Sequence, residues 1–434
     1  MKLRLVILLV FAHLSVSAQA TPVPTKVTLA SGRSFTLRIA EGFEIIPAME
    51  GLKRPRFFAK APDDRIFVSD LYNLMDNKRG VIYILEGLNV DTGKFARAVP
   101  YMTGLRNPNS VQFHRDAEGQ EWIYIAETHR LTRRKFTRAE TRPTDDPPQT
   151  LATFPDYGLS YKYGGWHLTR TIAFAPNGKL YVSVGSSCNS CKEKEKVRAS
   201  VIEMNPDGSE QREFARGLRN AVGMRAIGDK LYVTNQGSDH LGKNRPDETF
   251  YSLADGVDYG WPFCHSANGR LIADPSVKRR GACRDVATPF AFFPARSSAL
   301  GFDFFDSDAP AANSNSFLVA LHGSTDKSIG RGYKIVSLKS GARPHDFITG
   351  FLAAGKVNGR PCDVLKLDAN SFLVSDDYSG IIYLVRAKGS QAAVATPTSE
   401  PQITGNFPAN HEQDRACLAI VLALFAVTIA SRTL

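Results

Sequence analysis

The sequence predicts an all-β protein folded as a six-bladed β-propeller. One strand-turn-strand unit can be traced six times along the chain, and no long amphipathic helical pattern interrupts the series. Successive units begin about 50 to 60 residues apart, with one longer gap between the fourth and the fifth. Repetition at this period is typical of a propeller, because each unit forms one blade and the blades pack around a ring.

Each unit combines a turn rich in Gly, Asn or Asp with a run of β-branched and aromatic residues, which is a hairpin signal. The six runs occupy residues 66–68, 122–125, 180–184, 231–233, 317–319 and 372–374. A third strand is expected at residues 81–84, 200–204, 332–336 and 381–385. The unit is therefore predicted to be a meander of three or four strands.

The start of the chain and the longer gap have separate predicted roles. Strands near residues 35–46 are expected to complete the last blade and so close the ring. The longer gap is expected to hold an insertion that carries Cys264 and Cys283.

The two ends of the chain are predicted to lie outside the propeller, which spans residues 21–390. Residues 1–20 have a charged start at Lys2 and Arg4, an apolar stretch and the sequence Ala18-Gln19-Ala20, as in a secretory signal peptide. We therefore expect export to the periplasm or the extracellular space.

Residues 391–415 read as a flexible linker, and residues 416–434 as a hydrophobic tail. The apolar run in this tail is shorter than the roughly 20 residues that span a bilayer. A marginal membrane anchor, a processed sorting or lipid-anchor signal and a packed helix therefore stay open, with membrane tethering favoured.

The formal net charge of +11 is spread along the chain rather than gathered in one segment. Nucleic acid is therefore not an expected partner of this exported protein. The charge fits solubility together with attraction for an anionic ligand.

The six cysteines are Cys188, Cys191, Cys264, Cys283, Cys362 and Cys417. In an oxidising compartment we expect disulfides between Cys264 and Cys283 and between Cys188 and Cys191. A four-cysteine zinc site is the alternative. Covalent haem attachment is not expected, because Lys192 stands where that motif needs a histidine.

An Arg/Asn/Pro-type motif precedes the first strand of most units. It is seen at Arg54-Pro55, Arg106-Asn107-Pro108, Thr169-Arg170, Arg219-Asn220 and Arg360-Pro361. A propeller gathers the starts of its innermost strands around one mouth of its central channel, so these motifs are predicted to converge there.

The polar residues predicted at this mouth suggest a site for a polycarboxylate. They are His167, Arg219, Asn220, Lys327 and Arg360, with Gln236 and Asp239 just after an inner strand. Arginine binds carboxylates through two parallel hydrogen bonds, and lysine adds a point charge. His167 is suited to take a proton from an alcohol at neutral pH.

The other histidines are given weaker roles. His240 and His322 are expected near the mouth and are kept as further candidates for a role in the site. His114, His129 and His345 are expected at the surface or in turns.

Seven segments together resemble the soluble pyrroloquinoline-quinone (PQQ) sugar dehydrogenases, and above all their L-sorbosone dehydrogenase-like branch. They are residues 165–182, 217–220, 235–237, 258–262, 322–324, 359–361 and 374–377. The resemblance covers nearly the whole body, residues 35–386, and its specificity lies in the order and spacing of the segments.

The resemblance implies a role for each mouth residue. His167 matches the general base, and Arg219 and Asn220 match the pair that hydrogen-bonds the quinone oxygens. Gln236 falls in the cofactor loop, and Lys327 and Arg360 fall where cations bind the cofactor carboxylates, with Arg331 as the alternative to Lys327.

The resemblance also implies a calcium ion, held by main-chain oxygens of Gly237 and Ser238 together with the cofactor, with Asp247 nearby.

Two departures bear on specificity. Gly185-Ser186-Ser187 stands where glucose-oxidising members carry an acidic residue beside the base, so a preference for glucose does not follow. Ser238 replaces a proline of those members, which a main-chain ligand tolerates.

The expected function is therefore that of an exported quinoprotein. It would oxidise a sugar or polyol-derived aldehyde or alcohol with PQQ as hydride acceptor, and pass the electrons to an external cytochrome or quinone. The alternatives are a calcium-dependent lactonase-type hydrolase, which needs Glu, Asn and Asp ligands where this mouth is cationic, and a non-catalytic binding propeller.

Overall fold

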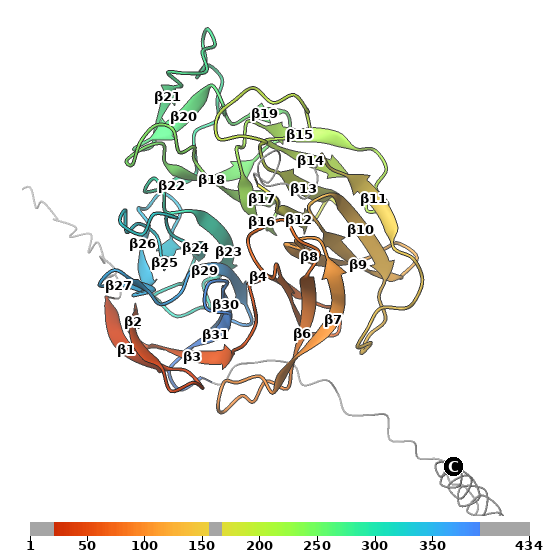
Figure 1. Cartoon of the computed structure of the whole chain (residues 1–434), viewed down its shortest axis with the longest axis vertical. Coiled ribbons are helices and arrows are strands. Elements are labelled where there is room, and N and C mark those ends of the chain that lie inside the picture. The colour runs from red at the N-terminus through yellow and green to blue at the C-terminus, as the bar shows by residue number, and fades with distance from the viewer. Residues whose placement is uncertain (1–20, 156–166, 391–434) are drawn as a thin grey trace, which may run out of the picture. The chain divides into compact units, whose positions relative to one another are not determined.

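The computed structural model describes residues 21–155 and 167–390, which form a six-bladed β-propeller (Figure 1). The predicted signal peptide, linker and hydrophobic tail lie outside these residues. Within residues 21–155 and 167–390 no helix is long and apolar enough to cross a membrane.

The first three blades follow the chain in order, and each runs outward from its inner strand by antiparallel pairing. The strands of the first blade are β4 (Pro55–Lys60), β5 (Ile66–Asp70), β6 (Gly80–Glu86) and β7 (Arg97–Leu105). Those of the second are β8 (Ser110–Arg115), β9 (Glu121–Ala126), β10 (Arg130–Lys135) and β11 (Gln149–Thr153). Those of the third are β12 (Arg170–Phe174), β13 (Leu180–Val184), β14 (Ser200–Met204) and β15 (Arg212–Arg216), with the short parallel strand β19 (Val257–Asp258) at its edge.

The last three blades repeat this plan. The fourth contains β16 (Ala221–Ile227), β17 (Lys230–Asn235), β18 (Glu248–Leu253) and β22 (Ala291–Phe293). The fifth contains β23 (Ala299–Phe305), β24 (Ser316–Leu321), β25 (Lys334–Leu338) and β26 (His345–Thr349), extended by β2 (Ser34–Ala40) and β1 (Pro22–Thr28). The sixth contains β29 (Pro361–Lys366), β30 (Ser371–Asp376), β31 (Ile381–Ala387) and β3 (Phe43–Met49).

The ring is closed by a strand from the start of the chain. Strand β3 pairs antiparallel with β31, so the third strand of the chain and the last one lie side by side in the sixth blade (Figure 1). The prediction for residues 35–46 was right for β3 and wrong for β2, which pairs with β26 in the fifth blade. The turn between β2 and β3 therefore crosses from one blade to the next, and both blades gain an outer strand that covers an otherwise open edge.

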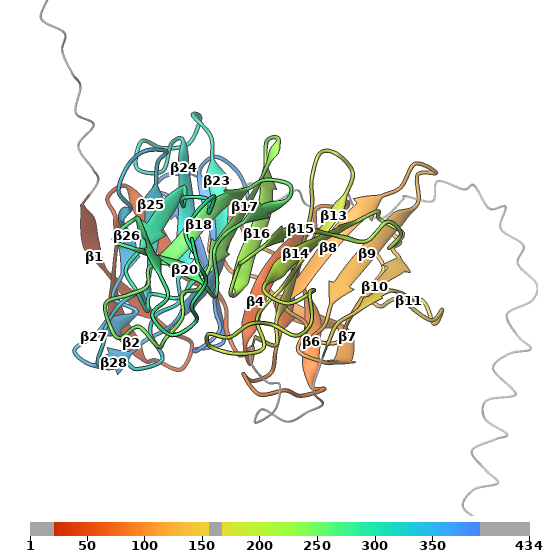
Figure 2. The same ribbon diagram turned by 90° about the horizontal axis from the view of Figure 1, so that it is seen from above.

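The hydrophobic core lies between neighbouring blades rather than in one central cluster. One cluster joins Phe67 and Ile84 of the first blade to Ile125 of the second. Another joins Phe250 of the fourth blade to Phe302 of the fifth, whose rings meet edge to face with centroids 4.8 Å apart. Every residue of the second strands β5, β13, β24 and β30 is buried, which explains why these strands are continuous apolar runs in the sequence. Figure 2 shows the same ring after a quarter turn, with the second and fifth blades on opposite sides.

The long gap between the fourth and fifth repeats holds the predicted insertion. It contains a hairpin of β20 (Cys264–Ala267) and β21 (Arg270–Ala273), which lies beside the outer part of the fourth blade (Figure 1). A disulfide between Cys264 and Cys283 closes the insertion, as predicted. A second small hairpin, β27 (Leu352–Ala353) with β28 (Lys356–Val357), precedes the sixth blade.

Candidate active site at one mouth of the ring

The strand starts of the ring meet at one rim. In three blades, the segment after the second strand bonds to the segment before the inner strand of the next blade. Thr128 Oγ1 donates to the Leu168 carbonyl at 2.8 Å, the Ser186 amide donates to the Arg219 carbonyl at 2.8 Å, and Gln236 Nε2 donates to Ser298 Oγ at 2.8 Å.

The other three junctions follow the same rule. Arg360 Nε donates to the His322 carbonyl at 3.2 Å, and Arg54 Nη1 donates to the Asp377 carbonyl at 3.0 Å. The Asn77 amide donates to Asn107 Oδ1 at 3.0 Å. The five Arg/Asn/Pro-type motifs, together with Ser298 before the fifth inner strand, are therefore neighbours around one mouth although they are spread over the whole chain.

The inner strands are irregular where they leave this mouth. The ladders of β4, β16, β23 and β29 each shift register within their first residues. Such bulges re-aim side chains and are frequent beside active sites. In β16 the shift follows Ala221, so it comes directly after Arg219 and Asn220.

His167 stands just before β12, with its main chain in the left-handed region at a φ of 50°. Its Nδ1 lies 2.9 Å from the Ser186 carbonyl and 3.0 Å from Ser186 Oγ. Ser186 Oγ donates its own hydrogen to the Cys188 carbonyl at 2.6 Å, so both Ser186 oxygens act as acceptors toward the ring. Nδ1 therefore carries the proton, and Nε2 is the basic nitrogen of His167.

The imidazole of His167 is neutral at physiological pH. Burial holds its pKa well below the ordinary value, and the positive charge of Arg219 lowers that pKa further. A neutral imidazole with a fixed tautomer is the state that a general base requires.

Gly185 lies next to both the base and a residue of the fourth blade. A Cβ placed on Gly185 would lie 2.5 Å from the His167 Cβ and 2.5 Å from Asn220 Oδ1. Only glycine leaves enough room here, so His167 and Asn220 both pack against Gly185.

Arg219, Asn220 and Gln236 form the next part of the rim. Arg219 is 4% exposed and donates from Nε and Nη2 to the carbonyl and the side-chain oxygen of Asn189, at 2.9 and 3.0 Å. Asn220 Nδ2 donates to Gln236 Oε1 at 2.7 Å. Burial lowers the pKa of Arg219, and among the described residues no carboxylate forms a salt bridge with this guanidinium.

Glu248 stands behind the Gly237–Ser238 loop, and sequence reasoning missed it. Its side chain accepts from the Gly237 amide at 3.1 Å and from the Arg296 amide at 3.0 Å. Burial raises the pKa of Glu248 to about 7, although the hydrogen bond from Gly237 and the charge of Arg219 act in the opposite direction. Ser238 is buried, and its hydroxyl accepts from Trp261 Nε1 at 3.2 Å.

The acidic residue singled out in the sequence, Asp247, serves the insertion instead. Its carboxylate accepts from Ser266 Oγ at 2.7 Å and from the amides of Asn268 and Gly269 at 3.0 and 2.9 Å. Asp247 therefore fixes the β20–β21 hairpin. Its neighbour Glu248 is the carboxylate that contacts the Gly237 loop. The only sign of this role in the sequence was the position of Glu248 at the start of β18, the strand that follows the loop.

Arg360 lies on another part of the rim, between the fifth and sixth blades. Besides the His322 carbonyl, its guanidinium donates to the Gly323 carbonyl, and it lies 5.4 Å from the ring centroid of Tyr333. Burial lowers the pKa of Arg360, which forms no salt bridge with any described carboxylate.

His322 is buried next to Arg360 and bonds through Nε2 to Asp377 Oδ1 at 2.7 Å. Asp377 also forms ion pairs with Arg56 at 2.9 Å and with Arg54 at 3.8 Å. Burial lowers the pKa of His322 to about 4, so its ring is neutral, while the pKa of Asp377 is held below its usual range by His322 and the two arginines in spite of burial. The sequence named His322 as a reserve residue and gave Asp377 no role.

The remaining predicted cations and acids are placed differently. Lys327 is exposed in the segment between β24 and β25. Arg331 donates to the carbonyls of Lys243 and Ala295, so it joins the fourth blade to the fifth. Asp239 is paired with Arg296.

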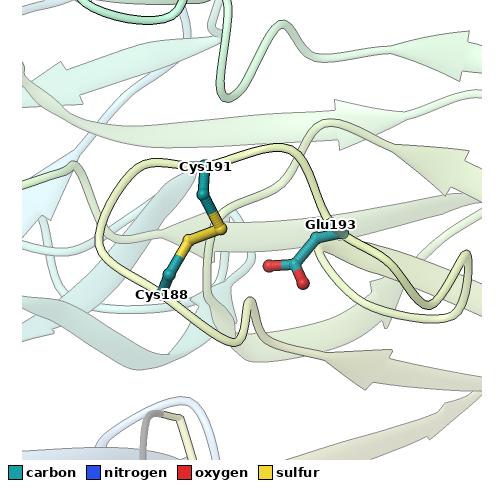
Figure 3. Close-up of side chains that lie close together, drawn as sticks. All are labelled: Cys188, Cys191 and Glu193. Carbon is teal, nitrogen blue, oxygen red and sulfur yellow. A yellow bond between two sulfur atoms is a disulfide. The ribbon is translucent and has the colours of Figure 1, made fainter.

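The disulfide between Cys188 and Cys191 is present, as predicted, and it closes a short loop (Figure 3). Because both sulfurs are bonded to each other, neither is a thiolate ligand for zinc. Glu193 lies next to this loop and accepts from the amide and the hydroxyl of Ser187, both at 2.7 Å. The loop also carries Asn189, the residue that holds Arg219.

Two of the histidines expected at the surface or in turns are half-buried strand residues. His114 lies on β8 and stacks on Phe174, with ring centroids 4.3 Å apart, and His345 begins β26. His129 lies in the turn between β9 and β10, as predicted.

One large cavity lined by described residues contains none of His167, Arg219 and Arg360. It measures about 1180 Å³ and lies between the outer strands of the fourth and fifth blades, next to Phe292 and Arg343. A smaller cavity reaches the rim at Arg219, Gln236 and Gly237. Size alone does not identify the reactive site, because the large cavity touches neither His167 nor any of the buried rim arginines.

Comparison with known proteins identifies the family and supports the fold. The model of the family described as glucose/sorbosone dehydrogenase matches residues 59–325. An uncharacterized protein of Borreliella burgdorferi is 28% identical over 221 residues, which cover 48% of this chain and 57% of that protein. The chain thus matches little more than half the length of this relative.

Solved structures share the fold at low sequence identity. The PQQ domain of pyranose dehydrogenase from Coprinopsis cinerea, in its holo form, superposes with a TM-score of 0.66 at 19% identity, covering 81% of this chain and 97% of that one. A calcium structure of a Trichoderma reesei enzyme of carbohydrate-active family AA12 gives 0.65 at 17% identity, covering 85% and 98%. The PQQ-bound aldose sugar dehydrogenase of Streptomyces coelicolor gives 0.55 at 16% identity, covering 79% and 98%.

Proposed function

This chain belongs to the glucose/sorbosone dehydrogenase family, a family of sugar oxidoreductases, and we propose that it is an exported quinoprotein that oxidises a sugar or polyol-derived aldehyde or alcohol at the rim of its propeller. The observation that carries the proposal is the arrangement of His167. It is a neutral imidazole with Nδ1 held by Ser186, and it packs against the same glycine as Asn220.

The rim residues fit the cofactor PQQ, a tricarboxylate with an ortho-quinone. Arg219 and Arg360 are cations without a salt-bridge partner among the described residues, and burial makes an anionic ligand the natural counter-charge. Two of the structural relatives are PQQ-containing proteins by description, which supports the same cofactor here. When bound, PQQ supplies the two-electron acceptor for hydride from the substrate carbon.

The protein's own groups would divide the remaining work. Nε2 of His167 takes the proton from the substrate hydroxyl, while Ser186 keeps the ring oriented. Arg219 and Asn220 donate hydrogen bonds to the oxygens that become negative during the reaction, as in an oxyanion hole. Asn189 fixes the Arg219 guanidinium, so these donors are positioned before the substrate binds.

Lys327 and Arg360 are proposed to bind cofactor carboxylates, and Gln236 to contact the cofactor from the fourth blade. Arg360 is already oriented by the carbonyls of His322 and Gly323. Lys327 is exposed and would have to move toward the mouth from its loop, whereas Arg331, its alternative, is engaged between two blades.

A calcium ion is proposed at the main-chain oxygens of Gly237 and Ser238, completed by oxygens of the cofactor. Calcium prefers several oxygen ligands in flexible geometry, and a main-chain loop with the buried Glu248 behind it suits that preference. The calcium structure from Trichoderma reesei supports this choice of metal. Calcium bound here would add positive charge near the quinone carbonyl.

Export, the electron acceptor and the tail complete the proposal. Two disulfides fit an oxidising compartment outside the cytoplasm, in keeping with the signal peptide proposed for residues 1–20. The reduced cofactor would pass its electrons to an external cytochrome or quinone. The linker 391–415 and the tail 416–434 would tether the propeller domain 21–390 to a membrane surface.

The proposal is tested by reconstitution. Purified mature protein is incubated with PQQ and calcium, and dye reduction is followed with a panel of aldoses and sorbosone, with and without the quinone. Activity that needs both PQQ and a sugar is the expected result. Failure to bind PQQ at micromolar concentrations would overturn it.

A further inference from the structure

We propose that His240, His265 and Asp274 form a binding site for a divalent transition-metal ion of the zinc class, separate from the cofactor and calcium positions. Three segments bring them together. His240 lies between β17 and β18, His265 lies on β20, and Asp274 directly follows β21. One residue therefore comes from the fourth blade and two from the insertion.

The carboxylate of Asp274 is oriented before any metal arrives. Its Oδ1 accepts from the amides of Ser276 and Val277 at 2.7 and 2.8 Å. Its Oδ2 points to the imidazoles, 2.7 Å from Nε2 of His240 and 2.7 Å from Nε2 of His265. The three potential ligand atoms lie within 4.8 Å of one another, so one small cation can contact all of them.

The surroundings favour a cation at this point. Asp274 is 4% exposed and His265 is 7% exposed, and neither Lys nor Arg of the described chain forms a salt bridge with Asp274. A buried carboxylate between two imidazoles carries one negative charge without a full counter-charge, which a divalent ion would supply. The His240 side chain is 21% exposed and leaves a route from solvent.

The donor set selects the kind of metal. Two imidazole nitrogens and one carboxylate oxygen suit zinc, copper or nickel, whereas calcium and magnesium prefer oxygen ligands only. Three protein ligands leave a fourth position for water. Coordination through Nε2 requires each imidazole to place its proton on Nδ1, which is a change of tautomer and not of charge.

The backbone around the cluster is rigid enough for a metal site. The Cys264–Cys283 disulfide begins at the residue next to His265, and the Asp274 amide donates to the Phe263 carbonyl at 2.8 Å. The metal would tie this hairpin to the loop that continues from Gln236 to His240, and so stiffen one wall of the rim. Ser190 of the disulfide loop adjoins the same carboxylate, with Oγ 3.5 Å from Asp274 Oδ2.

The test is a zinc titration of the mature protein, purified without a histidine tag and free of PQQ, in saturating calcium. Calorimetry or a competing chromophoric chelator measures the affinity, and thermal unfolding with and without zinc measures the stabilisation. We expect one zinc ion per chain at micromolar affinity or tighter, together with a rise in Tm. Cobalt in place of zinc should give visible d–d absorption from a site with nitrogen and oxygen ligands.

Two variants and one control locate the site. His240→Ala removes an accessible ligand, and Asp274→Asn keeps the Oδ1 acceptor for Ser276 and Val277 but removes the charge. Each substitution should weaken zinc binding by at least about tenfold. Removing a residue that only hydrogen-bonds to a metal ligand already weakens metal binding by about that factor, and these substitutions remove a ligand itself. His345→Ala, a histidine of β26 in another blade, should bind zinc as the wild type does.

The proposal is overturned if the wild type does not bind zinc in the micromolar range. It is also overturned if His240→Ala and Asp274→Asn bind zinc as tightly as the wild type, or if His345→Ala loses binding to the same extent. Because the measurement uses neither PQQ nor a sugar, its failure is independent of any failure of the dehydrogenase function.

Discussion

The carbonyl oxygen of Ser186 lies 2.9 Å from Nδ1 of His167, and this one contact decides which ring nitrogen is basic. Ser186 follows β13 and His167 precedes β12, so the two are joined across a single blade of the propeller. The Ser186 amide donates in turn to the Arg219 carbonyl of the next blade. The base and the cationic part of the rim are therefore positioned by the same residue.

Replacing His167 by Ala is expected to lower the rate of cofactor reduction by roughly 10²- to 10⁴-fold, the range that general bases contribute. PQQ affinity should change little, because the arginines and not the imidazole carry the counter-charge. Stopped-flow absorbance of the reconstituted protein measures the rate, and fluorescence titration measures the affinity. His345→Ala is the matched control, and a His167→Ala protein that no longer binds PQQ would show that the histidine is structural.

The pH profile of the reaction should be flat across neutral pH. The pKa of His167 is well below its ordinary value because of burial and the charge of Arg219, so the imidazole is already unprotonated at pH 6.5. Protonation inactivates the base only at more acidic pH, and the rate should fall there and not between pH 8 and 6.5. Single-turnover rates across this range provide the test, and a loss of half the rate near pH 6.5 would contradict the assignment.

Arg219→Gln should weaken PQQ binding by at least about tenfold, since a charge-assisted hydrogen bond contributes roughly 1.5–3 kcal/mol. Arg216→Gln removes the same charge three positions away, from an exposed side chain on β15. A titration with PQQ separates the two variants. Equal effects in both would mean that net charge, and not the guanidinium at the rim, attracts the cofactor.

Loss of the Cys188–Cys191 disulfide should weaken the cofactor site while leaving the propeller folded. The loop that it closes carries Asn189, whose carbonyl and side-chain oxygen hold Arg219. We expect a Cys188→Ser, Cys191→Ser double variant to bind PQQ several-fold less tightly, with a far-ultraviolet circular dichroism spectrum like that of the wild type. Unchanged affinity would show that Asn189 keeps its position without the bridge.

Stability should fall as the pH drops from about 6.5 to about 4, partly because of His322. Its pKa is about 4 in the folded protein and about 6.5 when unfolded, so the unfolded state binds the proton more readily in this window. A difference of this size contributes about 3 kcal/mol above pH 6.5, and that contribution is lost progressively toward pH 4.

Urea unfolding at a series of pH values measures this loss. His322→Gln keeps a donor for Asp377 but cannot titrate, so its stability should vary less between pH 6.5 and 4. The lowered pKa of Asp377 adds its own loss only below about pH 4, because it lies below the unfolded value for aspartate. An identical pH dependence in the variant and the wild type would exclude His322 as the source.

Several features of this protein could be predicted from the sequence because they depend on neighbouring residues. The hairpin turns and their period predict six blades, and strand polarity then requires Arg219 and Arg360 to reach the same mouth although they belong to different blades. Both disulfides join cysteines that are close in sequence, three and 19 positions apart, so short loop closure was enough to predict them.

Other features were decided only by the tertiary structure. Strand β2 joined the fifth blade because its partner β26 comes from the distant end of the chain, and a strand pattern does not name its partner. Only one of Asp247 and Glu248 can face the Gly237 loop, since side chains of adjacent strand residues point in opposite directions. Hydrogen bonds from a hairpin about 20 residues away hold the Asp247 side chain, and Glu248 therefore contacts the loop. His240, His265 and Asp274 form a cluster only because an insertion folds back onto its own blade. Local patterns along the chain were enough to predict the blades and the order of residues around the mouth, whereas long-range hydrogen bonds in the loops set where each side chain points.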